Sequence, residues 1–170
     1  MKYTSAEAAK VLRKLNEDHA ALLEKEGKSS VFVAAVGEEL EEVRPAYDYG
    51  EVQAQLAELE RKTRIVKHAI NLFNQSTIVP GFDMTVDQML VYIPQLSARK
   101  NKLLRMAGRL PKERLHASGY AAKAIIEYSY ANYDIEKAEK DLAQVNDELA
   151  RAQTGLDVVN NSAMLEIDLS

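Results

Sequence analysis

Apolar residues recur at alternating steps of three and four along four stretches of this 170-residue chain. The clearest stretch is an unbroken heptad pattern formed by Val52, Leu56, Leu59, Thr63, Val66, Ile70 and Phe73. This spacing puts the apolar side chains on one side of an α-helix, where they must be buried against another helix. The pattern therefore predicts a chain built from helix–helix contacts, within one molecule or between copies.

Local signals set the ends of the predicted helices. Thr4 with Glu7, and Thr85 with Gln88, have the spacing of a capping box, which marks a helix N-terminus. Asp134 precedes the last apolar stripe, so the final helix is expected to start there. The predicted helices span residues 4–26, 51–75, 85–110 and 134–160.

Three helix-breaking residues fall at or inside these helices. Gly27 is well placed to end the first helix in a left-handed conformation. Pro94 lies inside the third helix, where a missing hydrogen bond and a steric clash predict a kink or a break. Gly155 lies inside the last helix, at a cost of about 1 kcal/mol relative to alanine.

Two other segments predict short strands. Residues 31–36 are rich in β-branched side chains and lack the polar face of a surface helix. Residues 125–131 alternate tyrosine or isoleucine with polar residues, as a half-buried strand does. We expect these segments to pair, although a two-stranded ribbon needs helices beneath it or strands from another subunit. Leu165, Ile167 and Leu169 alternate with acidic residues and predict a last short strand or an ordered tail.

The predicted fold is mainly α, with elongated antiparallel helical hairpins forming a coiled-coil bundle that carries a small β-ribbon. A single domain over residues 1–170 is the ordinary expectation at this length. The exposed strand edges and the heptad patterning of all four helices predict that the protein forms a homo-oligomer.

Composition excludes several classes of protein. The chain has no cysteine, which rules out disulfides and thiolate metal sites. No apolar run approaches the ~20 residues that cross a bilayer, and the N-terminal residues do not form a secretory signal. A net charge of −4 gives no global attraction to nucleic acid or anionic lipid. We therefore expect a cytoplasmic protein that does not bind membranes.

The sequence contains no arrangement typical of catalysis. No two of the histidines His19, His68 and His116 have the His-x-x-x-His spacing, and the predicted helices carry no Glu-x-x-His motif of a di-metal bundle. His19 falls on an apolar stripe, where a hydrogen-bonded structural histidine is the ordinary interpretation. The chain also lacks a phosphate-binding glycine loop and a nucleophile elbow. We predict a protein that is not an enzyme and has no catalytic residue, metal or cofactor.

Basic residues gather on the third helix at Arg99, Lys102, Arg105 and Arg109. One interpretation is an anion-binding face for nucleic acid. The favoured interpretation is charge complementation with the acidic last helix, since oppositely charged flanks select helix partners. The stretch also lacks interleaved aromatic residues for base stacking, so nucleic-acid binding is the alternative function rather than the main one.

Polar residues at the end of the second helix form a candidate polar network: Asn71, Asn74 and Thr77. Their side chains can cap the helix end, bind water in a buried network or line a small-ligand site. Capping is the favoured interpretation, because the last carbonyls of a helix need donors. Tyr128, Tyr130 and Tyr133 form either a binding patch or, more commonly, a cover over the helices.

Two neighbouring segments resemble a family of small bacterial helical proteins, some of which are labelled septicolysin. Residues 70–77 (Ile-Asn-Leu-Phe-Asn-Gln-Ser-Thr) match its Ile-Asn-x-x-Asn-x-x-Thr pattern, and residues 85–90 resemble the helix opening that follows. In layout the resemblance covers residues 4–162. It departs at residues 92–95, where the family continues with Arg-Asp, and the usual Asn-Trp near the C-terminus is missing. The resemblance implies a long helical, oligomeric protein of unestablished role. The cell-lysing activity suggested by the name septicolysin is not carried over to this chain.

Together these features predict a non-enzymatic structural or interaction protein that self-associates through heptad-patterned helices. The alternative is a nucleic-acid-binding protein that uses the basic face of the third long helix. The sequence does not name a protein partner.

Overall fold

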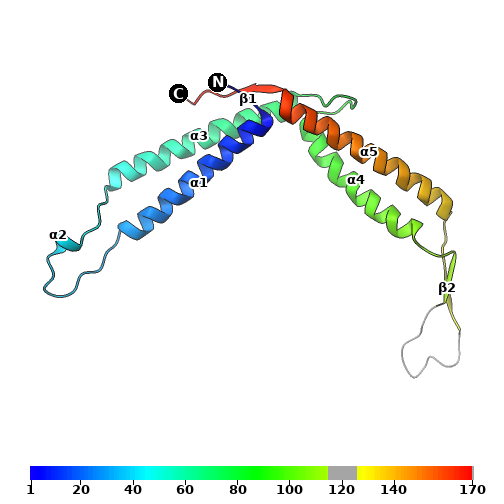
Figure 1. The fold of residues 1–170 in the computed structure, drawn as a ribbon, viewed down its shortest axis with the longest axis horizontal. Coiled ribbons are helices and arrows are strands. Elements are labelled where there is room, and N and C mark those ends of the chain that lie inside the picture. Colours follow the sequence, from blue (N-terminus) through cyan, green and yellow to red (C-terminus); the bar gives the residue numbers. More distant parts are fainter. Residues whose placement is uncertain (115–125, 170) are drawn as a thin grey trace. The chain divides into compact units, whose positions relative to one another are not determined.

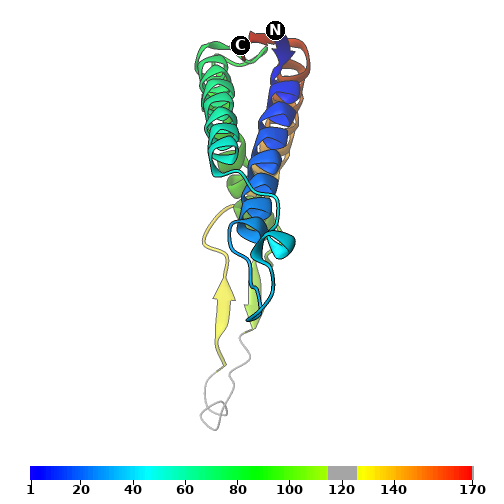
Figure 2. The same ribbon diagram turned by 90° about the vertical axis from the view of Figure 1, so that its left-hand side faces the viewer.

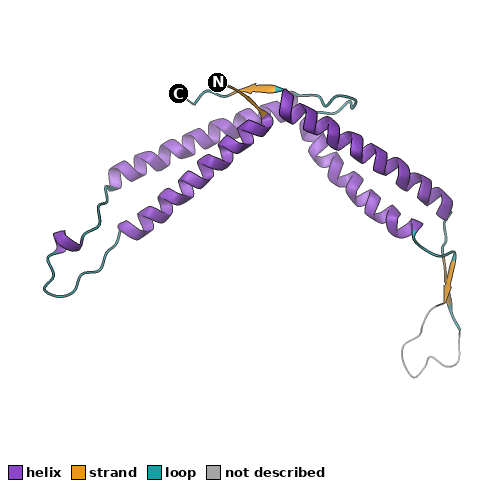
Figure 3. Cartoon of the chain, viewed as in Figure 1, coloured by secondary structure: helices purple, strands orange, loops and turns teal. Residues whose placement is uncertain are grey.

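The computed structural model describes residues 1–114 and 126–169, and helices make up most of it (Figures 1 and 3). Its elements are β1 (Lys2–Thr4), α1 (Ser5–Ser29), α2 (Leu40–Val43), α3 (Tyr49–Ser76), α4 (Val86–Ala107), β2 (Lys112–Arg114), β3 (Tyr128–Tyr130), α5 (Ile135–Ser162) and β4 (Met164–Glu166). The prediction of a mainly α fold with small β elements is confirmed. The four long helices begin and end within three residues of their predicted bounds.

The chain divides into two compact units. Unit 1 consists of Met1–Thr77 and Val158–Ser170, and unit 2 consists of Ile78–Asp157. Helix α5 contributes residues to both units. The assignment of the whole chain to one domain stays a prediction.

In unit 1, α1 and α3 form an antiparallel helical hairpin (Figures 1 and 2). Gln53 donates a hydrogen bond to Glu26 at 2.8 Å, and farther along the hairpin His19 lies 3.5 Å from the carboxylate of Glu60. The contacts move backwards along α1 as they advance along α3, as antiparallel packing requires. All seven residues of the heptad pattern in α3 are buried or half-buried, and Val66 is fully buried. The apolar periodicity therefore predicted the packed face correctly.

The two ends of the chain pair as an antiparallel sheet of β1 and β4. Met1 and Ile167 exchange two backbone hydrogen bonds of 2.9 Å. Leu165 and Ile167 are buried, and β4 contacts α3. The predicted C-terminal strand is confirmed. Its partner β1 was not predicted, because three residues carry too little periodicity to be recognised.

In unit 2, α4 and α5 form a second antiparallel pair. Tyr92 donates to Glu148 at 2.5 Å, and Tyr133 donates to the carbonyl of Met106 at 2.8 Å near the other end of α4. Leu96 of α4 is fully buried. Apolar burial therefore holds this pair together, and the tyrosine hydrogen bonds fix its register.

Two predictions about helix breaks are corrected. Helix α1 continues through Gly27, and the N–H of Ser30 donates to the carbonyl of Glu26 at 2.8 Å, so the prediction that Gly27 ends the helix in a left-handed conformation is wrong. Helix α4 runs through Pro94 without a break, so of the two predicted outcomes the break is wrong and the kink stays a prediction. The carbonyl that loses its partner belongs to the exposed Leu90, where water can bind it.

The prediction that residues 31–36 form a strand is wrong, because this segment is an exposed loop. Strand β3 lies within the predicted 125–131 segment, but it pairs with β2. In the loop, Glu38 donates its N–H to the carbonyl of Ala35 at 3.1 Å, and its carboxylate accepts the N–H of Ala35 at 2.7 Å. Gly37 occupies this turn with φ of +94°. A β-prone composition gives a strand only where another strand supplies hydrogen bonds, and here a local turn satisfies the backbone instead.

An ion-pair cluster on α3 fastens the C-terminal residues of unit 1. The guanidinium of Arg61 donates to the Glu58 carboxylate at 2.8 and 2.9 Å and to the carbonyl of Leu169 at 3.1 Å. The ammonium of Lys62 lies 3.3 Å from the same carboxylate. Hydrogen bonding from Arg61, assisted by Lys62, lowers the pKa of Glu58 to about 2.

This cluster predicts an acid-sensitive contribution to stability. We expect Glu58→Gln to lower the melting temperature at neutral pH. A carboxyl group whose folded pKa is depressed stabilises the fold above its unfolded pKa, and this stabilisation disappears as the pH falls through the folded pKa. The difference from wild type should therefore vanish between pH 4.5 and about 2. Glu42→Gln on the exposed α2 is the control and should leave the melting temperature unchanged, and a Glu58→Gln difference that persists at the lowest pH would refute the assignment.

Candidate functional site

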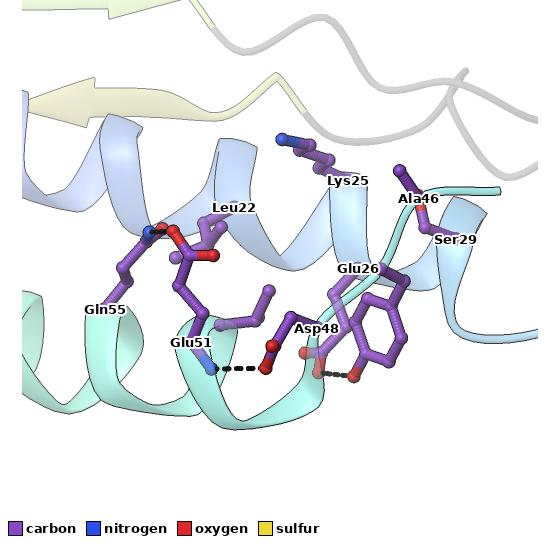
Figure 4. Close-up of a pocket in the computed structure, with 10 residues that line it drawn as sticks. Leu22, Lys25, Glu26, Ser29, Ala46, Asp48, Glu51 and Gln55 are labelled. Carbon is purple, nitrogen blue, oxygen red and sulfur yellow. Dashed lines mark hydrogen bonds between the residues drawn. The ribbon is translucent and has the colours of Figure 1, made fainter.

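A pocket of about 330 Å³ lies where the chain returns from the loop to the start of α3 (Figure 4). At its centre, the carboxylate of Glu26 accepts hydrogen bonds from the Tyr47 hydroxyl and from Nε2 of Gln53, both at 2.8 Å. The hydrogen bond to Glu26 raises the pKa of Tyr47. Glu26 thereby fastens the end of the loop to the helical hairpin.

The other carboxylates of this pocket are also used in local structure. Asp48 caps α3 by accepting the N–H of Glu51 at 2.9 Å, and the Glu51 side chain accepts from Gln55 at 2.9 Å. Over residues 1–114 and 126–169, no group of three His, Cys, Asp or Glu side chains is arranged to hold a metal ion. The geometry of the pocket is explained by helix capping and loop attachment.

The predicted polar residues at the end of α3 lie in different surroundings. Thr77 donates its N–H to the carbonyl of Phe73 at 2.9 Å and lines a groove of about 490 Å³ between α3 and β4. Asn71 is exposed and Asn74 is half-buried, and neither side chain makes a hydrogen bond to another described residue. The polar network of these three residues stays a prediction.

The two described histidines, His19 and His68, lie on different helices, α1 and α3. His19 is half-buried beside Glu60, in keeping with a structural role. His68 lines the groove between α3 and β4. His116 lies outside the described residues.

The predicted basic face is exposed. Arg99, Lys102 and Arg105 lie on α4, and Arg109 follows its C-terminal end. None of these four forms an ion pair within 4.0 Å of a described residue. Charge complementation with α5 therefore produces no direct ion pair at these positions, and the face is available to an anion.

The β2–β3 ribbon brings together two tyrosines of the predicted row and two cations, Lys112 and Arg114, that follow the predicted basic face in the sequence. Lys112 lies opposite Tyr130, and Arg114 lies opposite Tyr128. The ammonium of Lys112 lies 4.0 Å from the centre of the Tyr128 ring and 5.4 Å from that of Tyr130. Both tyrosines are exposed, so the alternation in this strand does not place them against the helices. The sequence signal for this arrangement is an alternation of residue types. Cations flank Glu113 in residues 112–114, and tyrosines flank Ser129 in residues 128–130.

The loop after α1 displays apolar side chains. Val31, Val33 and Val36 are 77%, 92% and 109% exposed. The loop is nevertheless held in place, because the Arg44 guanidinium lies 5.8 Å from the centre of the Phe32 ring. Local contacts thus fix the backbone while the valines stay uncovered.

Comparison with solved structures finds a similar fold in the crystal structure of a functionally unknown conserved protein from Corynebacterium diphtheriae. The two chains are 17% identical with a TM-score of 0.59, and the match covers 98% of this chain and 100% of the other. At this identity the likeness shows the fold alone. No protein-family model matches the chain, and no curated protein matches it. The resemblance to the septicolysin family stays a prediction.

Among the described helices, none combines the length and the apolar character needed to cross a bilayer.

Proposed function

We propose that this chain is a non-enzymatic structural or interaction protein that self-associates through its helices. The observation that supports this proposal is the apolar surface left uncovered on the long helices. Each hairpin buries one stripe of each helix, and large apolar side chains remain exposed elsewhere on the same helices. These side chains are Leu23, Leu72, Leu90, Val91, Leu104 and Val158.

The architecture of each helix pair supports the same proposal. A pair of helices has no third element to cover its outer sides, and burying apolar area contributes roughly 25 cal/mol per Å². Association with a second copy would supply the missing cover.

The strands also offer unpaired edges. Both sheets of the described chain have two strands, so every strand has one edge without a backbone partner. Free edges of this kind are templates for pairing with another chain. Pairing between copies would extend either sheet without any change in the helices.

The proposal predicts a mass above 19.0 kDa in solution. Size-exclusion chromatography with light scattering over micromolar concentrations measures it. We expect Leu72→Glu in α3 or Val91→Glu in α4 to lower the mass towards that of the monomer, because a buried charge opposes an apolar interface. Gln75→Glu and Gln95→Glu introduce the same group at exposed polar positions of the same helices and should change nothing. A wild-type monomer at all concentrations would contradict the proposal.

Polyanion binding is the second candidate function, favoured by the exposed basic face of α4. Reversing the charges of Arg99, Lys102, Arg105 and Arg109 together should abolish retention on a heparin column. Retention of the wild-type protein should fall steeply as salt is raised, since phosphate or sulfate binding releases counterions. A wild-type protein that flows through at low salt would exclude this function.

A further inference from the structure

One face of the β2–β3 ribbon carries two cations and two tyrosines. Successive side chains of a strand point to opposite faces, and directly paired residues share a face. The register therefore places Lys112, Arg114, Tyr128 and Tyr130 on one face, which we term the cation–tyrosine face. The acidic residue of β2, Glu113, lies with Ser129 on the opposite face. The negative charge is thus kept away from the two cations.

The base of the ribbon is attached to the end of α4. Ala131 donates its N–H to the carbonyl of Pro111 at 3.1 Å. Tyr133 donates to the carbonyl of Met106 in the last turn of α4 at 2.8 Å. These two bonds place the cation–tyrosine face directly beyond the helix end that carries exposed basic residues.

The two tyrosine rings are separated by 6.4 Å between centroids and are exposed. Tyrosine rings that cover a core are buried, whereas these are 43% and 62% exposed for Tyr128 and Tyr130. An uncovered two-stranded ribbon of this kind is only marginally stable in water. A ligand that stacks on the rings would stabilise it.

We propose that the cation–tyrosine face binds single-stranded nucleic acid. Exposed aromatic rings stack on unpaired bases, while neighbouring cations contact the phosphates. In this arrangement Tyr128 and Tyr130 stack on bases, and Lys112 and Arg114 pair with the backbone. A duplex keeps its bases stacked inside and offers the rings no base face. The site differs from the basic face of α4 in using aromatic side chains, and it does not depend on self-association.

An anionic membrane is less suited to this face. Each lysine or arginine near an anionic surface contributes about 1 kcal/mol, and stable attachment needs a larger basic cluster or an added apolar anchor. The cation–tyrosine face has two cations, and none of its four side chains is aliphatic. Single-stranded nucleic acid uses all four groups, because its bases stack on the rings and its phosphates pair with the cations.

Fluorescence anisotropy with a labelled oligothymidylate at low salt tests the proposal on the full chain. We expect Tyr128→Ala with Tyr130→Ala to weaken binding at least tenfold, because stacking accounts for an effect of about fivefold or more per base and two rings are lost. The double Tyr→Phe variant keeps the rings and should bind within about threefold of wild type. Lys112→Gln with Arg114→Gln should lower the slope of log affinity against log salt by about 1 to 1.5.

The controls separate this site from the opposite face of the ribbon and from self-association. Glu113→Gln with Ser129→Ala alters the opposite face of the same ribbon and should not weaken binding. Leu72→Glu tests whether a change in oligomeric state matters, and we expect unchanged affinity per chain. Far-ultraviolet circular dichroism confirms that each variant keeps its helices. The proposal is overturned if the wild type does not bind the oligonucleotide, if loss of both rings has no effect, if a duplex binds equally well, or if phosphatidylserine vesicles bind and the oligonucleotide does not.

Discussion

Replacing Leu96 by alanine is expected to lower the free energy of unfolding by about 3 kcal/mol. Leu96 has no exposed surface and lies in α4, which pairs with α5 in unit 2. Truncation removes buried methyl groups and leaves a cavity that two rigid helices cannot fill by a small shift. The expected loss is large relative to the total stability of an ordinary domain, which is about 5–15 kcal/mol.

Gln95 provides a control on the same helix. It is exposed and polar, so Gln95→Ala should change the free energy of unfolding by no more than about 0.5 kcal/mol. Urea denaturation followed by circular dichroism compares the two variants. Equal effects would mean that the two faces of α4 are equally buried, contrary to the packing described above.

Replacing Gly155 by leucine is expected to destabilise unit 2 by about 2–3 kcal/mol. A Cβ atom at this position of α5 would lie 3.0 Å from Cγ1 of Val79 and 3.2 Å from the carbonyl oxygen of Pro80. Val79 is fully buried and the Pro80 atom belongs to the backbone, so neither can move aside easily. The close approach of this loop explains why glycine stands inside a helix, despite its low helix propensity.

The same substitution at Gly27 should have the opposite sign. Gly27 lies within α1, and a Cβ atom there meets nothing within 4 Å. Leucine should therefore stabilise the helix by about 0.5 kcal/mol through its higher helix propensity. Thermal unfolding of the two variants checks the pair. A stabilising Gly155→Leu would show that the loop at Val79 can move without cost.

The helices were predictable because their signals are local. The three–four periodicity of residues 52–73 specified both the existence of α3 and the face that it buries. The capping boxes at Thr4 and Thr85 are both present in the structure, with hydroxyl and N3 side chain each bound to the backbone. Asp134 accepts the N–H of Lys137 at 3.1 Å, as its predicted place at the start of α5 requires. Each of these signals acts within one or two helical turns.

The strands were predicted less well because strand pairing is not local. Residues 31–36 have the composition of a strand, but the structure gives them no partner and closes them with a turn at Gly37. Residues 112–114 have no strand-like composition, yet they pair with β3. Propensity alone could not choose between these two partners for the tyrosine-containing strand, since β-propensity depends strongly on context.

For the candidate site too, the features with local signals were predictable and the strand pairing was not. The sequence identified the basic residues of α4 and the row of tyrosines as separate features. It could not show that Tyr128 and Tyr130 lie opposite Arg114 and Lys112, because 13 or more residues separate these strands and no pattern specifies their register. The aromatic residues that the basic stretch lacks in sequence lie on β3, which pairs with β2 just beyond the end of α4.

The amino-acid sequence by itself determined that this chain is helical, where its long helices lie and which stripe of each is buried, because helical periodicity is set by residues only three or four positions apart. The tertiary structure decided which strands pair, that the two chain ends join in one sheet, and that cations and tyrosines share one face of a ribbon. These features depend on residues that meet only when the helices pair and bring distant parts of the chain together.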